Sequence, residues 1–508
     1  MKCIFRTVKL TVVLAFLAAC GGGSSSLDNE LGLRVINASP DAPLVTFRLD
    51  GQPWFTLDYK GGTRFTYLTP ASREMVLEVV LPGDDVLIEE SMSLLAGREY
   101  TTIAVGKLGE DGSSTLEMLN IDNPLAAVPV GTTSVQFVHA ASDTAAIDVY
   151  LTAPEDSLAG ATPYFSLGYI QMPAPLQQDV LSGIWRIRIT PAGDKDTLLF
   201  DSGDVVLRSA ASLLFVVVSN TAAGPAPISL LTNDGTFSGQ ILDIATPADV
   251  RVVNVSPDLP ALDATAERAL RKDTPPPEPP LPAPCIYDST LSFDNVLCVA
   301  PAPEVTPLAA NLVYPGPAPY AALDFSISPP DGYEFLNLDN YYAFKVAATD
   351  APNTLLFGTN LPLVQGGRTT LMALGLVPQP VDDVVTAKIL AVLTDDARPV
   401  ARIGKLRIVD ASPAGSSVDV YIEAPGTDLT AENASLAGLG LGSSTSHFSF
   451  EPGSYTVSFT TAGTKTVLAS ATLNANSMSV STVVLVDTAR SVSADGTPLQ
   501  VLVIDDLL

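Results

Sequence analysis

Residues that commonly carry acid–base chemistry are scarce in this sequence. The chain contains two histidines, His139 and His447. His139 stands where three related segments of the chain have Asn or Asp, so capping of a turn is its favoured role. His447 has no partner that the sequence identifies. GxSxG, HExxH, phosphate-binding-loop and paired CxxC motifs do not occur. We therefore assign no catalytic residue and expect a protein that is not an enzyme.

Recurring aspartates are the best candidates for metal chemistry. Calcium takes six to eight oxygen ligands, which neighbouring turns or domain junctions could supply. A DxDxDG loop does not occur, and turn capping or solvation explains the same residues. We therefore expect no cofactor, with calcium as the alternative. The candidates are Asp41, Asp143 and Asp258 in turns, and Asp148, Asp263 and Asp419 on the strands that follow.

The first 19 residues have the pattern of a secretion signal. Basic residues precede an apolar run over residues 10–16, and such a segment is removed rather than folded. The run is shorter than the ~20 apolar residues that a spanning helix needs. We therefore expect the mature chain to begin near residue 20, in an exported protein.

The residues around Cys20 suggest a covalent anchor. Leu17-Ala18-Ala19-Cys20 resembles the lipobox of bacterial lipoproteins, in which the cysteine becomes the acylated N-terminus. Two or more acyl chains give stable anchoring. The resemblance implies lipid on Cys20, and Gly21 in place of aspartate implies the outer membrane, with the protein facing the periplasm or the cell surface. An ordinary signal peptide with a chance cysteine is the alternative. Residues 20–32 begin with a Gly/Ser run that predicts a flexible tether.

Four segments of the chain align without gaps. Each predicts a short β-branched strand, a turn with Ser-Pro-Asp chemistry and a second, alternating strand. The segments begin 102, 115 and 156 residues apart, and about seven strands fit in a unit of about 100 residues. The count predicts an all-β protein of four tandem immunoglobulin-like antiparallel β-sandwich domains. The segments are VINASPDAPLVTF from Val35, FVHAASDTAAIDV from Phe137, VVNVSPDLPALDA from Val252 and IVDASPAGSSVDV from Ile408.

The openings of these units also resemble a known family. LRVINASPDAP and LRIVDASPAGSSVDVYIEA are similar to the signature VRVVHASPDAPAVDVYVDG of a domain of unknown function in exported and lipid-anchored bacterial proteins. The resemblance implies a β-sandwich and no assigned activity. We predict repeat 1 at residues 33–123, repeat 2 at 134–244, repeat 3 at 249–396 and repeat 4 at 405–508.

The third repeat is longer than the others. Ala261-Leu262-Asp263 is echoed by Ala322-Leu323-Asp324, which predicts a proline-rich insert over residues 264–322. Cys285 and Cys298 lie within it and are predicted to form a disulfide, since an exported chain meets an oxidising compartment. Two free thiols are the alternative. Tyr287 and Phe293 would then be exposed on a recognition loop, unless the insert is only a spacer.

The composition and net charge limit which kinds of partner this protein can bind. The chain has 508 residues and a net charge of −28, so it should fold as several domains and repel nucleic acid. The favoured function is a lipid-anchored envelope protein whose non-catalytic sandwiches bind or scaffold an unknown protein or glycan, in surface adhesion or matrix contact. Four domains in line would reach about 140 Å. The alternative is a periplasmic or surface glycan-active enzyme using loop carboxylates.

Overall fold

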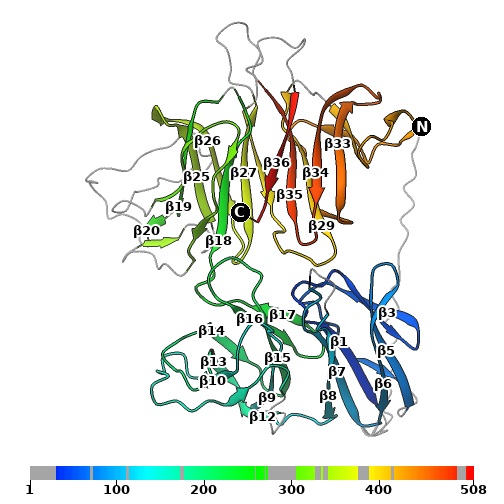
Figure 1. The fold of residues 1–508 in the computed structure, drawn as a ribbon. Helices are drawn as coiled ribbons and strands as arrows, with labels where there is room; N and C mark the ends of the chain where they lie inside the picture. Colours follow the sequence, from blue (N-terminus) through cyan, green and yellow to red (C-terminus); the bar gives the residue numbers. More distant parts are fainter. Residues whose placement is uncertain are drawn as a thin grey trace, which may run out of the picture.

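The computed structural model describes residues 30–68, 73–109, 114–171, 177–257, 259–268, 270–272, 305–325, 333–335, 341–375, 388–413, 417–488 and 499–507. These residues form β-strands joined by turns, with a short 3-10 turn at Leu429–Ala431. The strands build four β-sandwiches, each from two facing sheets (Figure 1). The predicted fold class is confirmed. No helix long and apolar enough to cross a bilayer occurs in this part of the chain.

Repeat 1 consists of the sheets β4-β1-β7-β8 and β3-β2-β5-β6. Its core lies between them, around Leu33, Val35, Phe47 and Val79. The strands are β1 (Leu31–Asn37), β2 (Val45–Leu49), β3 (Gln52–Leu57), β4 (Thr66–Leu68), β5 (Arg73–Leu81), β6 (Asp85–Leu94), β7 (Arg98–Val105) and β8 (Glu117–Pro124).

Repeat 2 pairs a five-stranded sheet, β12-β9-β15-β16-β17, with a four-stranded one, β11-β10-β13-β14. Phe137, Phe215 and Ile187 lie in its core, against which Trp185 packs. The strands are β9 (Thr132–His139), β10 (Ile147–Thr152), β11 (Phe165–Leu167), β12 (Gln178–Leu181), β13 (Gly183–Pro191), β14 (Phe200–Leu207), β15 (Ala211–Ser219), β16 (Ile228–Asn233) and β17 (Ser238–Ile241).

Repeat 3 has the sheets β22-β18-β27-β28, with β23 also on β18, and β21-β19-β25-β26. A separate two-stranded sheet joins β20 to β24. The strands are β18 (Ala248–Asn254), β19 (Leu262–Arg268), β20 (Leu270–Lys272), β21 (Thr306–Leu312), β22 (Gly316–Pro317), β23 (Ala321–Leu323), β24 (Tyr333–Phe335), β25 (Tyr341–Ala348), β26 (Ala351–Pro362), β27 (Arg368–Gly375) and β28 (Lys388–Thr394).

The predicted insert over residues 264–322 is too long. Strand β19 continues to Arg268, and β21 pairs with it as part of the sandwich. The second copy of the tripeptide, Ala322-Leu323-Asp324, does not continue the strand that begins at Leu262. Leu323 instead pairs with Ala248 at the edge of the other sheet, so the predicted end of the insert was wrong. The residues added to this repeat therefore lie between Arg268 and Thr306.

Repeat 4 has the sheets β32-β29-β35-β36 and β31-β30-β33-β34. In every repeat the first strand lies parallel to a later strand of the same sheet, as β29 does to β35, so the sheets are not purely antiparallel. The strands are β29 (Gly404–Asp410), β30 (Ser417–Glu423), β31 (Leu436–Gly440), β32 (Phe448–Phe450), β33 (Gly453–Thr461), β34 (Val467–Ala475), β35 (Val480–Asp487) and β36 (Leu499–Asp505).

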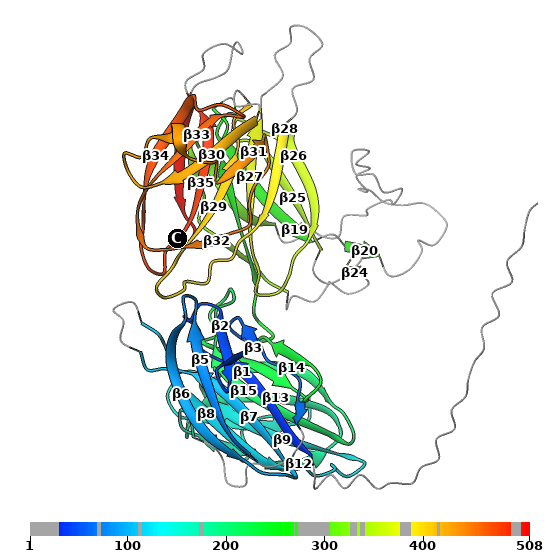
Figure 2. The ribbon, with the colours of Figure 1, turned by 90° about the vertical axis from the view of Figure 1, so that its right-hand side faces the viewer.

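The four sandwiches form two side-by-side pairs and not the expected line (Figures 1 and 2). Ile36 and Ile103 of repeat 1 pack with Val138 and Val216 of repeat 2 in one apolar cluster. A second cluster joins repeats 3 and 4 in the same way, through residues that include Val253. The first strand of each repeat is therefore buried on both faces, because one face meets its own core and the other meets the neighbouring repeat.

The two pairs also contact each other, end to end. The segment between repeats 3 and 4 lies against repeat 1, where Ala401 N donates to Asp41 O at 2.7 Å. The Arg398 guanidinium donates to the carbonyls of Pro40 and Ala42 at 3.2 and 3.0 Å. The four repeats thus form one assembly, with the pair of repeats 3 and 4 on the turn end of repeats 1 and 2.

Candidate functional site

Each repeat places a long polar side chain in the middle of its first strand, directly between two apolar residues. The residue lies three positions before the turn-forming Asn, His or Asp, and its side chain points into the contact between paired repeats. It is Arg34, Gln136, Arg251 or Arg407, and all four are buried. A buried guanidinium needs charged or hydrogen-bonding partners, so these positions organise the chemistry of both interfaces.

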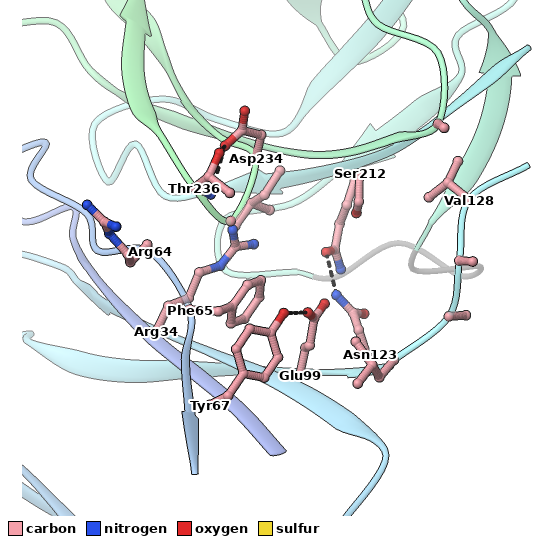
Figure 3. A pocket seen from close by; sticks show the side chains of 17 residues that line it. Arg34, Arg64, Phe65, Tyr67, Glu99, Asn123, Val128, Ser212, Asp234 and Thr236 are labelled. Carbon is pink, nitrogen blue, oxygen red and sulfur yellow. Dashed lines mark hydrogen bonds between the residues drawn. The ribbon is translucent and has the colours of Figure 1, made fainter. Parts of the chain in front are cut away.

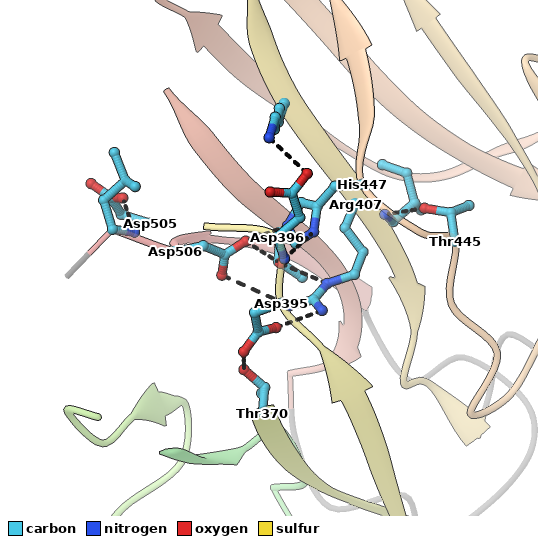
Figure 4. A network of polar contacts seen from close by, with 12 residues as sticks. Thr370, Asp395, Asp396, Arg407, Thr445, His447, Asp505 and Asp506 are labelled. Atoms are coloured by element: carbon cyan, nitrogen blue, oxygen red, sulfur yellow. Dashed lines mark hydrogen bonds and ion pairs between the residues drawn. The ribbon is translucent and has the colours of Figure 1, made fainter. Parts of the chain in front are cut away.

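In repeats 3 and 4 each arginine reaches a carboxylate of the other repeat. Figure 4 shows Arg407 with Asp395. Arg251 of repeat 3 pairs with Asp506 of repeat 4, and Arg407 of repeat 4 pairs with Asp395 of repeat 3 at 2.7 Å. Each arginine Nε donates to a threonine of its own sheet, Thr370 or Thr482, at 2.9 or 3.0 Å. The contacts that Arg251 makes to repeat 4 are therefore equivalent to those that Arg407 makes to repeat 3, so the network has approximate twofold symmetry.

Two further groups complete this network. Thr370 and Tyr320 donate to Asp395 Oδ2 at 2.6 and 2.8 Å. On the other side Thr482 donates to Asp506 Oδ2 at 2.6 Å, and His447 Nε2 lies 2.9 Å from the same oxygen. Tyr320 and His447 occupy equivalent positions, one residue before β23 and β32.

The structure thereby gives His447 the partner that the sequence did not identify. A His–Asp pair is the kind of arrangement that general bases use. Here, however, the side chains of His447 and Asp506 are 1 % and 0 % exposed, and Asp506 is also held by Arg251. A substrate has no access to this pair, and His447 instead helps to hold the Asp506 carboxylate that pairs with Arg251 of repeat 3.

The same place in repeats 1 and 2 is open. Arg34 donates to Asn233 of repeat 2, and Asn123 of repeat 1 donates to Gln136 Oε1 of repeat 2 at 3.1 Å. Amides thus replace the two carboxylates, and a glutamine replaces one arginine. Beside these contacts lies a cavity of about 350 Å³ between the two repeats, which we call the cleft (Figure 3).

The cleft is lined by aromatic, charged and amide groups together with the apolar linker between the repeats. Arg34 lies over the Phe65 ring, 4.3 Å from its centroid. The Tyr67 hydroxyl donates to Glu99 at 2.9 Å. The main lining residues are Arg34, Arg64, Phe65, Tyr67, Glu99, Asn123, Leu125, Val128, Gln136, Ser212, Asp234 and Thr236.

Electrostatics in the cleft are balanced. Arg34 and Arg64 supply two positive charges to the lining of the cleft, and Glu99 and Asp234 supply two negative charges. Burial lowers the pKa of Arg34 to about 10, against the opposing effect of Glu99 and Asp234, so the guanidinium keeps its charge at neutral pH. Burial and the hydrogen bond to Glu99 raise the pKa of Tyr67 to about 12, which keeps its hydroxyl a donor.

Exposed aromatic rings and unfilled hydrogen-bonding capacity mark this cleft. Tyr67 is 51 % exposed, and Phe237, in the turn that supplies Thr236, is 70 % exposed. Asn123 Oδ1 and Gln136 Nε2 are buried without a hydrogen-bond partner among the described residues. Buried amide atoms usually have partners, so one acceptor and one donor remain for a further group at the floor of the cleft.

The candidate calcium ligands are not brought together. Across the described residues, no three His, Cys, Asp or Glu side chains cluster as a metal site. Asp41 accepts from Leu108 N and Gly109 N at 2.9 and 3.0 Å, and Asp143 pairs with Lys107 at 2.7 Å. These two aspartates therefore have protein partners.

The three strand aspartates share one structural role. Asp419 accepts from Gly438 N and Gly463 N at 2.8 and 2.7 Å, on the two segments that flank its strand. Asp148 accepts from Ser166 and Gly193, and Asp263 from Asn311 and Thr349. The hydrogen bonds to Asp263 lower its pKa, that from Asn311 most. Each carboxylate thus joins a neighbouring strand (β31, β11 or β21) to a turn on the other side, which is the capping alternative.

The predicted capping position after the first strand also has partners in all four repeats. Asn37, Asn254 and Asp410 each accept from the backbone N–H two residues later. His139 Nδ1 accepts from Ala141 N at 3.4 Å, while its Nε2 lies 3.1 and 3.0 Å from the carbonyls of Thr144 and Ala145. Burial lowers the pKa of His139 despite these carbonyls, so it is a neutral capping residue.

Several predicted residues lie outside the described part of the chain. They are the signal segment, Cys20 and the tether to residue 29, Asp258, and Cys285, Tyr287, Phe293 and Cys298 of the added segment. The predictions for these residues stay predictions.

Sequence reasoning missed the interface arginines and the cleft. A signal was present, because Arg34, Arg251 and Arg407 recur at one position of the first strand, each between two apolar residues. A charge inside a two-sided apolar strand indicates a buried ion pair. The cleft itself had no such signal, because its lining residues come from both repeats and from the linker.

Comparison with known proteins adds a family match and distant structural likenesses. A family model described as a domain of unknown function (DUF4397) matches residues 32–150 and 404–507. No curated protein matches the chain. The Bacillus anthracis TIE protein is 11 % identical with a TM-score of 0.12 over 88 % of this chain, which spans 65 % of that protein's length.

Two other solved structures are similarly distant. The major pilin subunit BcpA of Bacillus cereus is 8 % identical, with a TM-score of 0.10, over 65 % of this chain and 88 % of its own. The multi-modular glycogen-degrading pneumococcal protein SpuA is 8 % identical, with a TM-score of 0.14, over 64 % of this chain and 37 % of its own. TM-scores this low do not define a shared overall fold.

Proposed function

We propose that this protein is a non-catalytic binding protein of the bacterial envelope, anchored in the outer membrane by lipid on Cys20. Its ligand is a neutral glycan segment that enters the cleft between repeats 1 and 2. The observation that carries the proposal is the contrast between the two pairs. An ion-pair network fills the interface of repeats 3 and 4, whereas in repeats 1 and 2 a cavity of about 350 Å³ lies beside the equivalent contacts.

The chemistry of the lining favours a polyhydroxylated, uncharged ligand. Arg34 and Arg64 are balanced by Glu99 and Asp234, so the cleft does not select a net charge. Its donors and acceptors stand close together, as sugar hydroxyls require, and the Tyr67 ring offers an apolar face for the C–H side of a pyranose. A few placed polar groups among apolar walls are typical of ligand sites.

The carboxylates of the cleft are poorly suited to catalysis. Glu99 accepts the Tyr67 hydroxyl. Burial alone would raise the pKa of Asp234, but hydrogen bonds from Phe237 and Thr236 lower it overall. A glycosidase acid needs a raised pKa so that it carries a proton at neutral pH. These contacts support binding without turnover.

The decisive experiment measures glycan binding and glycan cleavage together. Full-length protein should bind members of a glycan panel, and Tyr67→Ala should weaken binding at least tenfold. Tyr169→Ala, in an exposed tyrosine of repeat 2 outside the cleft, is the matched control and should bind normally. Binding that survives Tyr67→Ala, or hydrolysis of the bound glycan, would contradict the proposal. Palmitate labelling that is lost in Cys20→Ala tests the anchor.

A further inference from the structure

One end of the pair formed by repeats 1 and 2 carries apolar side chains that face solvent. We call this surface the apolar end. Val130 is 89 % exposed and Leu181 70 % exposed, and both are in segments where polar residues would normally lie. The members of the apolar end are Leu95, Val130, Leu181, Ile184 and Val206.

Backbone pairing shows that these residues adjoin one another. Ile184 lies directly across from Val206 on neighbouring strands, and Leu181 pairs with Thr132 at the start of β9. Ser182 N donates to Gly131 O, the residue after Val130. The linker over residues 125–130 reads Leu-Ala-Ala-Val-Pro-Val and carries no charge or side-chain hydrogen-bonding group. Exposed apolar surface that is contiguous marks an interaction site.

The described chain begins at this same end. Gly97 N donates to Glu30 O, and Leu125 N donates to Gly97 O. These two bonds bring the start of β1, the turn that holds Leu95 and the start of the linker together. Tyr59 donates to Ser219 O at the opposite end of the pair, so repeats 1 and 2 run in the same direction. Any tether that precedes Glu30 therefore leaves from the apolar end.

The second pair of repeats sits on the far side. Contacts such as Ala401 N to Asp41 O and Ala223 N to Gly366 O join repeats 3 and 4 to the turn end of repeats 1 and 2. Nothing described in repeats 3 and 4 covers the apolar end. Figure 2 shows this arrangement, with β9 and β12 at the pole remote from repeats 3 and 4.

We infer that the apolar end rests on the phospholipid surface in which Cys20 is anchored, so that repeats 3 and 4 point away from the membrane. The inference rests on the proposed anchor. Ten residues separate Cys20 from Leu31 and span at most ~35 Å when extended. A tether of this length holds the sandwich beside the bilayer at high effective concentration, so a few inserted apolar side chains suffice for contact.

The charges beside the apolar end indicate the kind of lipid. Asp179 and Asp204 are exposed there together with Arg208. An anionic surface would repel the acidic protein, whose net charge is −28. The occupant is therefore a zwitterionic phospholipid surface. The linker that supplies Val130 also lines the cleft, which places the glycan site close to the membrane.

Fluorescence quenching by lipid tests this orientation. Trp185 follows Ile184, and its Nε1 donates to Leu181 O at 2.8 Å, so it reports on the apolar end. The chain has two tryptophans, and Trp54→Phe leaves Trp185 as the single emitter. Lipidated full-length protein is reconstituted in phosphatidylcholine vesicles with or without a doxyl-labelled acyl chain. We expect the doxyl lipid to reduce Trp185 emission at least twofold.

Variants separate this inference from the anchor. Val130→Asp combined with Leu181→Asp and Val206→Asp should abolish the quenching while the protein still sediments with vesicles. Val364→Asp, at a residue of repeat 3 that is 74 % exposed, should keep it. If protein that carries palmitate shows the same Trp185 emission in vesicles with and without the doxyl lipid, this inference is wrong and the proposed anchor still stands. Absence of palmitate at Cys20 overturns the proposed anchor and, with it, this inference.

Discussion

Arg251 and Asp506 form a buried ion pair although 255 positions separate them in the sequence. The pair has a pseudo-symmetric counterpart in Arg407 and Asp395. Together they join repeats 3 and 4 through side chains that the apolar cluster around Val253 surrounds. Removal of one partner leaves a buried charge without compensation, so these contacts specify which faces meet.

Breaking this pair should destabilise the protein strongly. Arg251→Met leaves Asp506 buried without its guanidinium, and we expect a loss of about 3 to 5 kcal/mol in unfolding free energy. Asp506→Leu together with Arg251→Met should cost clearly less than the sum of the single changes, as a double-mutant cycle in urea would show. Additive effects would contradict a direct interaction.

The contact between repeats 1 and 2 can be tested at Ile103. This side chain is fully buried in the cluster shared by both repeats. Ile103→Ala should cost about 2 to 4 kcal/mol, because it leaves a cavity. Val503→Ala, at an exposed site in repeat 4, is the control and should cost less than about 0.5 kcal/mol. Equal urea midpoints for both variants would support four independent domains in line.

Asp410 should make stability depend on pH. Burial raises its pKa from its ordinary value to about 6, with a smaller contribution from Asp487, and its Oδ2 has no hydrogen-bond partner among the described residues. The contribution of protonated Asp410 to the free energy of unfolding is fully present below pH 3.8. It is lost as the pH rises through about 6, because the buried carboxyl then ionises.

Replacing Asp410 by Asn, the residue that repeats 1 and 3 have at this position, should remove this loss of stability at high pH. Asp410→Asn should stabilise the protein by roughly 2 to 3 kcal/mol at pH 8 and change little at pH 4, given ~1.4 kcal/mol per pKa unit. The reverse change in repeat 3, Asn254→Asp, should destabilise at pH 8. Thermal unfolding at both pH values measures this. An effect of Asp410→Asn that is the same at pH 4 and pH 8 would show that ionisation is not its cause.

Chelators should leave the melting temperature unchanged. The carboxylate oxygens of Asp419 accept backbone hydrogen bonds on both sides and are thus occupied by protein donors. Asp419→Ala should nevertheless cost about 1 to 3 kcal/mol, since two part-buried hydrogen bonds to a carboxylate are lost. Differential scanning calorimetry with EDTA and with added calcium is the measurement. A fall in melting temperature with EDTA would restore the calcium interpretation.

Local patterns predicted much of each sandwich. The Asn, His or Asp before each turn predicted its cap. The predicted limits of the insert in the third repeat were wrong, because the echo at Ala322 came from an edge strand that pairs with β18. A repeated tripeptide does not specify which strand it pairs with.

The sequence by itself determined the all-β class, the fourfold repeat and the roles of the turn residues, because these depend on neighbours within a strand or a turn. Only the tertiary structure decided that the sandwiches pair side by side, that His447 meets Asp506 and that the cleft lies between repeats 1 and 2. Burial on both faces of a first strand such as Leu31–Asn37 shows that something covers it. Its partner depends on residues in another repeat, and strand periodicity carries no information about contacts at that separation.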